Sequence, residues 1–448
     1  MRRLGTLTSA VGPALILAIL SMDLRAEDWP QFRGHGSSGV ASGTAKLPAE
    51  IGPETNVIWR TPVARGLSSP VVFGDRVYLT ALDEKRLLTL AFDRADGKKL
   101  WEAEAPYEKL EKVHRIGSPA TSSVATDGER VVSFFGSCGL FCHDVEGKLL
   151  WRKTMGPFDN GFGAASSPVL FEDRVIVLQD HDTGSFLATH DKETGETLWR
   201  TERENSRRNY STPVVWMVEG KPQIVVAGTA QVTGYDMGTG ELIWFARGMA
   251  RVVSSTPVVG DDGILYVVNS GGGGGVLHPA FDEVLKTSDK NENGVLEPKE
   301  CPKGSISSFF GQFDRDKNGS LDRKEYESIR DILGASQSVA MAVKPGGRGD
   351  VTESHVLWTR DKSIPRNASP VCHRGTLYMV KDGGVVTCLD AKTGEILSQE
   401  RAEGTGKYSS SPSLGDGKLY LFSERGELSV ITAEPEWKLL ASADFKED

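Results

Sequence analysis

The stretch SSPVLFEDRVIVLQDHDTGSFLATHDKETGETLW, residues 166–199, contains the unit from which most of the chain is built. Ser-Ser-Pro precedes two short apolar segments, and two further segments follow, the last of which closes on Trp199. Period-two alternation, as in the related Val-Tyr-Leu at 77–79, is typical of strands that bury one face. The turn Asp-x-x-Thr-Gly at 191–195 favours a type I turn followed by a glycine at positive φ, which makes a bulged hairpin. Four short strands in about 45 residues indicate a β-propeller blade.

The first half of this unit occurs seven times, and the copies begin at residues 68, 121, 166, 211, 254, 368 and 410. The second half ends in a tryptophan at positions 101, 151, 199 and 244, and Ser398 replaces that tryptophan in a later copy. We expect further closing tryptophans at Trp59, Trp358 and Trp437, because a large apolar side chain with one donor suits the wedge between neighbouring sheets. The serines before each proline recur once per repeat, which indicates a structural role.

The repeat predicts an all-β fold, a propeller of seven recognisable four-stranded blades. Trp59 precedes the first Ser-Pro strand, so its own strand is left over. The interval of 114 residues between Trp244 and Trp358 places an insertion in the fifth blade. We predict a signal peptide at 1–26, an N-terminal arm at 27–56, propeller segments at 57–274 and 337–448, and an inserted domain at 275–336.

The first residues are typical of an exported protein. Met1-Arg2-Arg3 is basic, the segment 11–20 is apolar, and Leu24-Arg25-Ala26 resembles a cleavage site. No later stretch is apolar for about 18 residues, so no membrane span is expected after signal cleavage. The net charge of −9 argues against nucleic-acid binding. Of five cysteines, Cys138 and Cys142 could form a disulfide across one hairpin or remain free.

The inserted domain contains two twelve-residue loops with the EF-hand pattern, 289–300 and 314–325, spaced 25 residues apart. Calcium takes six to eight oxygen ligands, and this loop supplies them from alternate positions. Gly294 and Gly319 occupy the sharp turn at position 6 of each loop. Apolar residues around the loops predict flanking helices. The predicted ligands are Asp289, Asn291, Asn293, the Val295 carbonyl, Glu297 and Glu300 in the first loop, and Asp314, Asp316, Asn318, the Ser320 carbonyl, Asp322 and Glu325 in the second.

The Ser/Thr-Pro strands, the closing tryptophans and the opening segment 28–34 (DWPQFRG) resemble the pyrroloquinoline-quinone-like (PQQ-like) β-propeller repeat family, which includes the outer-membrane assembly lipoprotein BamB. That resemblance implies an exported bacterial protein. Its members commonly have eight blades, the last one closed by an N-terminal strand. Because this chain ends eleven residues after Trp437, a seven-bladed ring and an incomplete eight-bladed ring both remain open.

The resemblance also bears on cofactors. Quinone-dependent dehydrogenases of this kind pack their quinone against a disulfide between adjacent cysteines, and this sequence has no adjacent cysteine pair. We therefore expect Ca²⁺ and do not expect PQQ. The predicted function is that of an exported, periplasmic or secreted, calcium-binding scaffold without enzymatic activity, which binds a protein or a component of the cell envelope. The alternative is a PQQ-dependent oxidoreductase.

Overall fold

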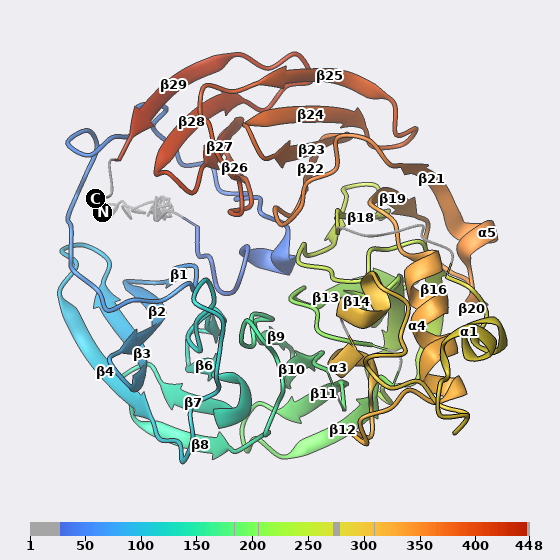
Figure 1. The fold of residues 1–448 in the computed structure, drawn as a ribbon. Coiled ribbons are helices and arrows are strands. Elements are labelled where there is room, and N and C mark those ends of the chain that lie inside the picture. Colours follow the sequence, from blue (N-terminus) through green and yellow to red (C-terminus); the bar gives the residue numbers. More distant parts are fainter. Residues whose placement is uncertain (1–26, 183, 205, 272–277, 309, 446–448) are drawn as a thin grey trace, which may run out of the picture.

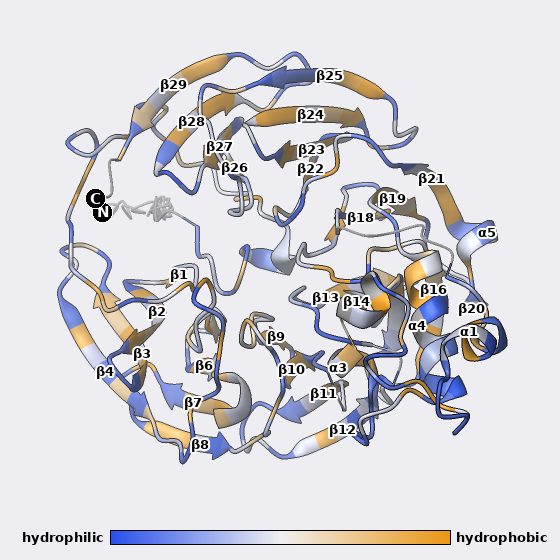
Figure 2. Cartoon of the chain, viewed as in Figure 1, coloured by the Kyte–Doolittle hydropathy of each residue, from blue (hydrophilic) through white to orange (hydrophobic). Residues whose placement is uncertain are grey.

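The computed structural model describes residues 27–182, 184–204, 206–271, 278–308 and 310–445. The predicted signal peptide, 1–26, lies outside the described residues. Seven antiparallel four-stranded sheets, the blades, surround a common centre, and one of them carries a short fifth strand (Figure 1). Hydrophobic residues follow the strands, whereas the connections are mostly hydrophilic (Figure 2). The prediction of an all-β propeller with seven four-stranded blades is confirmed.

Each blade consists of four strands in sequence order, from the centre outward. Blade 1 contains β1 (Val71–Phe73), β2 (Arg76–Asp83), β3 (Arg86–Asp93) and β4 (Lys99–Ala105). Blade 2 contains β5 (Ala125–Thr126), β6 (Arg130–Phe134), β7 (Leu140–Asp144) and β8 (Leu149–Lys153). Blade 3 contains β9 (Val169–Phe171), β10 (Arg174–Gln179), β11 (Phe186–Asp191) and β12 (Thr197–Glu202). Blade 4 contains β13 (Val214–Val218), β14 (Lys221–Gly228), β15 (Gln231–Asp236) and β16 (Leu242–Arg247), with β20 (Gly349–Asp350) added in parallel to β16. Blades 5 to 7 contain β17 (Val258–Val259), β18 (Leu265–Asn269), β19 (Val339–Val343) and β21 (Val356–Arg360); β22 (Val371–His373), β23 (Thr376–Lys381), β24 (Val385–Asp390) and β25 (Ile396–Arg401); and β26 (Ser413–Gly415), β27 (Lys418–Phe422), β28 (Glu427–Thr432) and β29 (Leu439–Asp444).

The outer hairpin of every blade is irregular at the same place. In all seven blades the register between the third and fourth strands shifts beside the turn. In blade 3 the shift lies between Thr189 and His190, and Gly195 in the adjoining turn has φ 74°. The bulged hairpin expected from the Asp-x-x-Thr-Gly turn is therefore present.

The hydroxyl side chains before the prolines link neighbouring blades. The backbone nitrogen of Ser69 donates to Ser123 Oγ at 2.9 Å, and the nitrogen of Ser123 donates to Ser167 Oγ at 3.0 Å. The same bond continues around the ring through Thr212, Thr256, Ser369 and Ser411. These hydroxyls satisfy backbone donors just before the inner strands of blades 1 to 6, where buried N–H groups need a partner. Their structural role, predicted from the repeat, is confirmed.

The closing tryptophan of a blade packs on the outer turn of the next blade. Trp151 Nε1 donates to the Lys192 carbonyl oxygen at 2.9 Å, and its ring lies over Gly195, where an added Cβ would be 2.6 Å from it. Equivalent bonds run from Trp101 to Val145, from Trp199 to Met237 and from Trp358 to Ala391, at 2.8–2.9 Å. Trp244 differs, because its Nε1 donates to Gln223 Oε1 of its own blade at 2.8 Å.

The prediction that Trp437 closes the last blade is wrong. Ala441 pairs with Val430 beside the bulge, as Trp101 pairs with Ala91 in blade 1, so Ala441 holds the closing position. Trp437 precedes β29 and lies in the turn, where it packs against the core between blades 6 and 7. At this boundary the large side chain therefore comes from the turn of blade 7, because the closing position of blade 6 holds the small Ser398.

The N-terminal arm, which in the structure continues beyond the predicted end at residue 56 and includes Trp59, bridges the two ends of the ring. Apolar clusters join blades 1 and 2 and every following pair up to blades 6 and 7, but none among the described residues joins blade 7 to blade 1. The arm passes between these blades (Figure 1). It binds blade 7 through Lys46, which pairs with Asp416 at 3.0 Å, and blade 1 through Trp59, whose Nε1 donates to the Arg94 carbonyl oxygen at 2.8 Å. Trp59 therefore takes the place of a closing tryptophan that blade 7 lacks.

The start of the arm lies at the inner strands. Trp29 pairs with Val72 of β1, and Val40 pairs with Leu414 of β26. Between them the 3₁₀ helix η1 (His35–Ser37) lies near the centre of the ring, and the buried Arg33 donates to the Pro370 carbonyl oxygen at 2.6 Å. The ring therefore consists of seven complete blades and the arm; the strand expected around Trp59 is not formed, and Trp59 packs against blade 1 from an extended segment.

We expect Trp151→Ala to destabilise the protein by about 3–5 kcal/mol, because it removes a largely buried aromatic ring between blades 2 and 3. Thermal or urea unfolding followed by circular dichroism measures the loss. Leu150→Ala is the matched control, since the neighbouring Leu150 side chain is 45% exposed and its removal changes little. Equal losses in both variants would show that the indole contact does not hold the blades together.

Candidate metal centre

The inserted domain leaves blade 5 between its second and third strands, β18 and β19. The two strands pair up to Asn269 and Val339, and Ser270 Oγ lies 3.0 Å from Ser338 Oγ, so the two ends of the insertion are adjacent. Four short helices follow in order: α1 (Phe281–Ser288), α2 (Ser305–Ser308), α3 (Phe310–Phe313) and α4 (Arg323–Ala335). Because its ends meet, the insertion leaves the hairpin of blade 5 intact.

The inserted domain has an apolar core of its own. Phe281 of α1 packs on Tyr326 of α4, with ring centroids 5.5 Å apart, and both side chains are buried. Leu296 and Leu321, one from each loop, are fully buried and exchange two backbone hydrogen bonds of 3.0 and 2.8 Å. Phe309, expected in the helix before the second loop, lies outside the described residues. This core places the two loops side by side.

The second loop brings its acidic residues together. One carboxylate oxygen of each of Asp314, Asp316 and Glu325 lies within 4.8 Å of the other two. Asp314 and Glu325 are buried, at 7% and 6% exposure, although both are acidic. The backbone of the loop holds them: Gly319 N donates to Asp314 Oδ2 at 3.0 Å, and Arg315 N donates to Glu325 Oε1 at 2.7 Å. Three converging carboxylates with hard oxygen atoms suit a divalent cation such as calcium.

The remaining predicted residues of the second loop shape the turn and the following helix. Asn318 Oδ1 accepts hydrogen bonds from the nitrogen and the hydroxyl of Ser320, at 2.8 and 2.7 Å. Asp322 is the N-cap of α4 and accepts from Glu325 N at 2.7 Å, while Glu325 Oε2 accepts from Asp322 N at 3.1 Å. This reciprocal capping box fixes Glu325 at the start of the helix.

The first loop repeats this backbone pattern with a different side-chain arrangement. Gly294 N donates to Asp289 Oδ2 at 2.9 Å, and Lys290 N donates to Glu300 Oε1 at 2.9 Å, as in the second loop. The amide nitrogens of Asn291 and Asn293, however, both donate to Glu297. The nitrogen of Val295, at position 7, donates to Asn293 Oδ1 at 3.1 Å. Fewer carboxylates converge here, so we expect the weaker site in this loop.

A charged cluster next to the inserted domain was missed by the sequence analysis. The buried Asp180 forms a bidentate ion pair with the buried Arg203, at 2.8 and 3.1 Å. Asp182 pairs in the same way with Arg208, whose Nε donates to Asp182 Oδ1 at 2.8 Å. These residues come from the β10–β11 loop and from the link between blades 3 and 4. The basic run Arg207-Arg208 in that link was the available signal in the sequence.

The inserted domain touches the connections of the propeller on this side. Lys317 Nζ lies 3.4 Å from Asp159 Oδ2 of the link between blades 2 and 3. Gln337 N donates to the Met249 carbonyl oxygen of the link between blades 4 and 5 at 3.3 Å. In Figure 1 the insertion accordingly lies over blades 3 and 4 and to one side of the centre. The second loop therefore stands next to the charged cluster.

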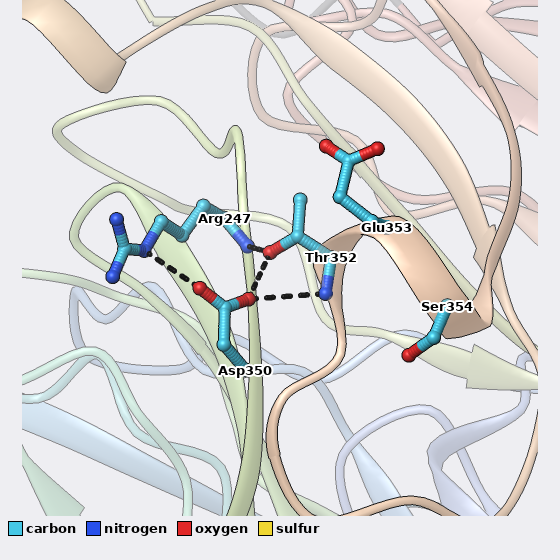
Figure 3. A pocket seen from close by; sticks show the side chains of 5 residues that line it. All are labelled: Arg247, Asp350, Thr352, Glu353 and Ser354. Carbon is cyan, nitrogen blue, oxygen red and sulfur yellow. Dashed lines mark hydrogen bonds and ion pairs between the residues drawn. The ribbon is translucent and has the colours of Figure 1, made fainter.

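A shallow pocket of about 320 Å³ lies near β20, away from these loops. Figure 3 shows that three of its five lining residues interact with one another: Arg247 Nε lies 3.4 Å from Asp350 Oδ2, and the Thr352 hydroxyl donates to Asp350 Oδ1 at 2.6 Å. Glu353 also lines the pocket, and its carboxylate forms no interaction with the other four lining residues in Figure 3. All five cysteines are free and buried, so Cys138 and Cys142 form no disulfide, and burial raises the pKa of the Cys138 thiol to about 11.

Comparison with known proteins identifies relatives of the propeller. A sequence profile of the family described as outer membrane protein assembly factor BamB matches residues 36–161, 90–282 and 348–443. The BamB of Yersinia pestis is 22% identical over 396 residues, 84% of this chain and 88% of the relative, and that of Burkholderia pseudomallei (strain K96243) is 23% identical over 390 residues, 82% and 86%. The profile matches leave out the stretch that contains both loops.

Solved structures with a similar fold include BamB from Moraxella catarrhalis, with a TM-score of 0.48 and 12% identity over 82% of this chain and 87% of that one. A europium-containing methanol dehydrogenase gives a TM-score of 0.45 and 11% identity over 91% and 90%. None of the helices within the described residues has the length and apolarity needed to cross a bilayer.

Calcium titration by calorimetry tests the two loops. We expect two ions to bind the unmodified chain, with dissociation constants of about 10⁻⁴–10⁻³ M, as in extracellular modules. Glu325→Gln and Glu300→Gln each remove the carboxylate at position 12, so each variant should bind one ion. Glu327→Gln is the control, because Glu327 lies on α4 beside Arg330 and outside the loop. Two ions in every variant would rule out these ligands.

Proposed function

Because this chain belongs to the family described as outer membrane protein assembly factor BamB, we propose that it is a calcium-binding scaffold of the cell envelope, which binds a protein partner and catalyses no reaction. The name of its relatives describes assembly of outer membrane proteins. The basic and apolar start of the chain supports export, so the proposed location is the periplasm or the outside of the cell. The observation that carries the calcium part of the proposal is the convergence of Asp314, Asp316 and Glu325 in a loop next to the propeller.

The proposed role of calcium is to order the inserted domain against the propeller. Asp314 precedes the turn of the loop, whereas Glu325 lies in the first turn of α4, so an ion held by both ties the loop to the helix. Without the ion, three carboxylates repel one another at short distance, which destabilises this arrangement. Lys317, in the same loop, then meets Asp159 of the propeller. Calcium thereby favours a docked insertion and a single shape of this face for a partner.

The alternative, a PQQ-dependent oxidoreductase, predicts a different outcome. Reconstitution with PQQ and calcium would then give dye-linked oxidation of an alcohol or a sugar. No contact among the described residues favours that activity over a scaffold. Under the proposal, the reconstituted protein shows no turnover above that of free PQQ.

Limited proteolysis tests the docking of the insertion. We expect cleavage within 278–336 to be about tenfold slower at saturating calcium than after calcium depletion, because local opening must precede cleavage. Cleavage sites in the propeller serve as the internal reference. Equal rates with and without calcium would contradict an ordering role, even if the ion binds.

Partner binding is tested by retention of envelope proteins on the immobilised chain at about 1 mM calcium, the upper end for extracellular modules. We expect a specific partner to elute on calcium depletion and to be absent with the Glu300→Gln/Glu325→Gln double variant. The Glu327→Gln chain should retain it. Retention of the partner independently of calcium would support a scaffold but contradict its control by calcium. Oxidation of an alcohol or a sugar with PQQ would contradict the scaffold and support the oxidoreductase.

A further inference from the structure

Arg207 is the member of the charged cluster that has no counter-ion. It lies between two balanced pairs, Asp180–Arg203 and Asp182–Arg208, each of which matches one carboxylate with one guanidinium. Arg207 itself is 4% exposed, and none of the described carboxylates forms an ion pair with it. A buried cation without a counter-ion is costly, because burial removes the hydration of the charge.

The hydrogen bonds of Arg207 leave part of its guanidinium unused. Nη1 donates to the carbonyl oxygens of Glu204 and Ser206, both at 2.9 Å. Its Nε is buried and has no hydrogen-bond partner in the structure. Buried polar groups nearly always have a partner, so this donor points to a group that the protein does not itself supply.

Arg315 of the second calcium loop shows the same deficit. Its Nη2 donates to Ser328 Oγ at 2.8 Å, but its Nε is buried and also lacks a partner. Contacts place the loop of Arg315 beside the link that contains Arg207. The backbone nitrogen of Asp182, the partner of Arg208, donates to the Asp159 carbonyl oxygen at 3.1 Å, and the Asp159 carboxylate lies 3.4 Å from Lys317 Nζ of the same loop. Consistently, burial first, and then Arg315, lower the pKa of Arg207 to about 10, while Asp182 and Glu325 act in the opposite direction. One arginine belongs to the propeller and the other to the insertion, so both unused donors lie on the side where these two parts face each other.

We propose that Arg207 and Arg315 together bind an oxyanion between the propeller and the second calcium loop. Guanidinium groups bind sulfate, phosphate and carboxylate oxygens through charge-assisted hydrogen bonds, and two of them suit a doubly charged tetrahedral anion. The ion supplies the missing counter-charge for both arginines and accepts from both unpartnered Nε groups. It also connects the two parts of the protein, because each arginine belongs to a different one.

The proposed calcium site strengthens this anion site. Asp314, Asp316 and Glu325 place three negative charges beside Arg315, and calcium offsets two of them. The potential at the arginines is then more positive, so the anion binds more tightly when calcium is bound, and by linkage calcium binds more tightly when the anion is bound. This coupling rests on the proposed function, whereas the anion site itself does not.

Calorimetric titration of the full chain with sulfate tests the site, with chloride replaced at constant ionic strength. We expect saturable binding of one sulfate, weakened about tenfold or more by Arg207→Gln and by Arg315→Gln, since each removes a charged donor. Arg200→Gln is the matched control, because Arg200 is an arginine of the exposed outer strand of blade 3 that pairs with Glu202 at 2.6 Å. Circular dichroism checks that each variant folds, and Arg315→Gln alone decides the matter if Arg207→Gln does not fold.

Two further arms separate the possible sources of the anion and its coupling to calcium. Binding of 4-nitrophenyl sulfate as tightly as sulfate identifies the end of a larger ligand, and binding of sulfate alone identifies a free ion. No saturable binding of either, or binding unchanged in both arginine variants, overturns the site. With calcium-depleted protein we expect sulfate affinity to fall about fivefold or more. Equal sulfate affinity with and without calcium contradicts the coupling but not the anion site. If the chain binds sulfate but no calcium, the proposed function is wrong and the anion site is retained.

Discussion

The contact between the closing tryptophan of one blade and the outer turn of the next is the interaction on which the ring depends. Backbone hydrogen bonds join the strands within a blade, whereas apolar side chains fill the space between neighbouring blades. An indole is large enough to fill the widening space at the rim, and its single donor finds the turn carbonyl, as Trp151 does at Lys192. The indole packs directly on the backbone of the turn and leaves no room for a Cβ, which is why this position, Gly195, is a glycine. Blade 6 has Ser398 at the closing position, and Trp437 from the outer turn of blade 7 fills the space that a closing tryptophan would occupy.

The same requirement explains the course of the N-terminal arm. Ala441 holds the closing position of blade 7 and offers no ring to blade 1. Trp59 supplies that ring from the arm, after the arm has crossed from the inner strands to the rim. The first and last parts of the propeller are therefore held together by a segment that belongs to neither blade. A leftover strand in the repeat count is thus the element that closes the molecule.

The inserted domain is a second folded unit that leaves the strands of the propeller intact. Its ends meet at Ser270 and Ser338, and its apolar core is separate from that of blade 5. Its position is nevertheless specific, because Lys317 and Gln337 contact two different links of the propeller. The family match leaves this domain out, so whatever it contributes distinguishes this chain from its relatives. It covers the place where three arginines and two aspartates of blades 3 and 4 gather.

The sequence by itself determined the blades, their turns and the loop residues of the insertion, because each of these depends on neighbours within about 15 residues. Strand alternation, the Asp-x-x-Thr-Gly turn and the alternating oxygen-bearing side chains of the two loops are local patterns that fold in one way. It did not distinguish a tryptophan at the closing position from one in the turn, since Trp437 and Ala441 differ by four residues and only strand register separates them. The tertiary structure alone decided that the arm closes the ring and that Lys317 of the insertion meets Asp159 of the propeller. The contact of the arm with blade 7 and that of the insertion with Asp159 join residues 370 and 158 positions apart, which only the closed path of the blades brings together.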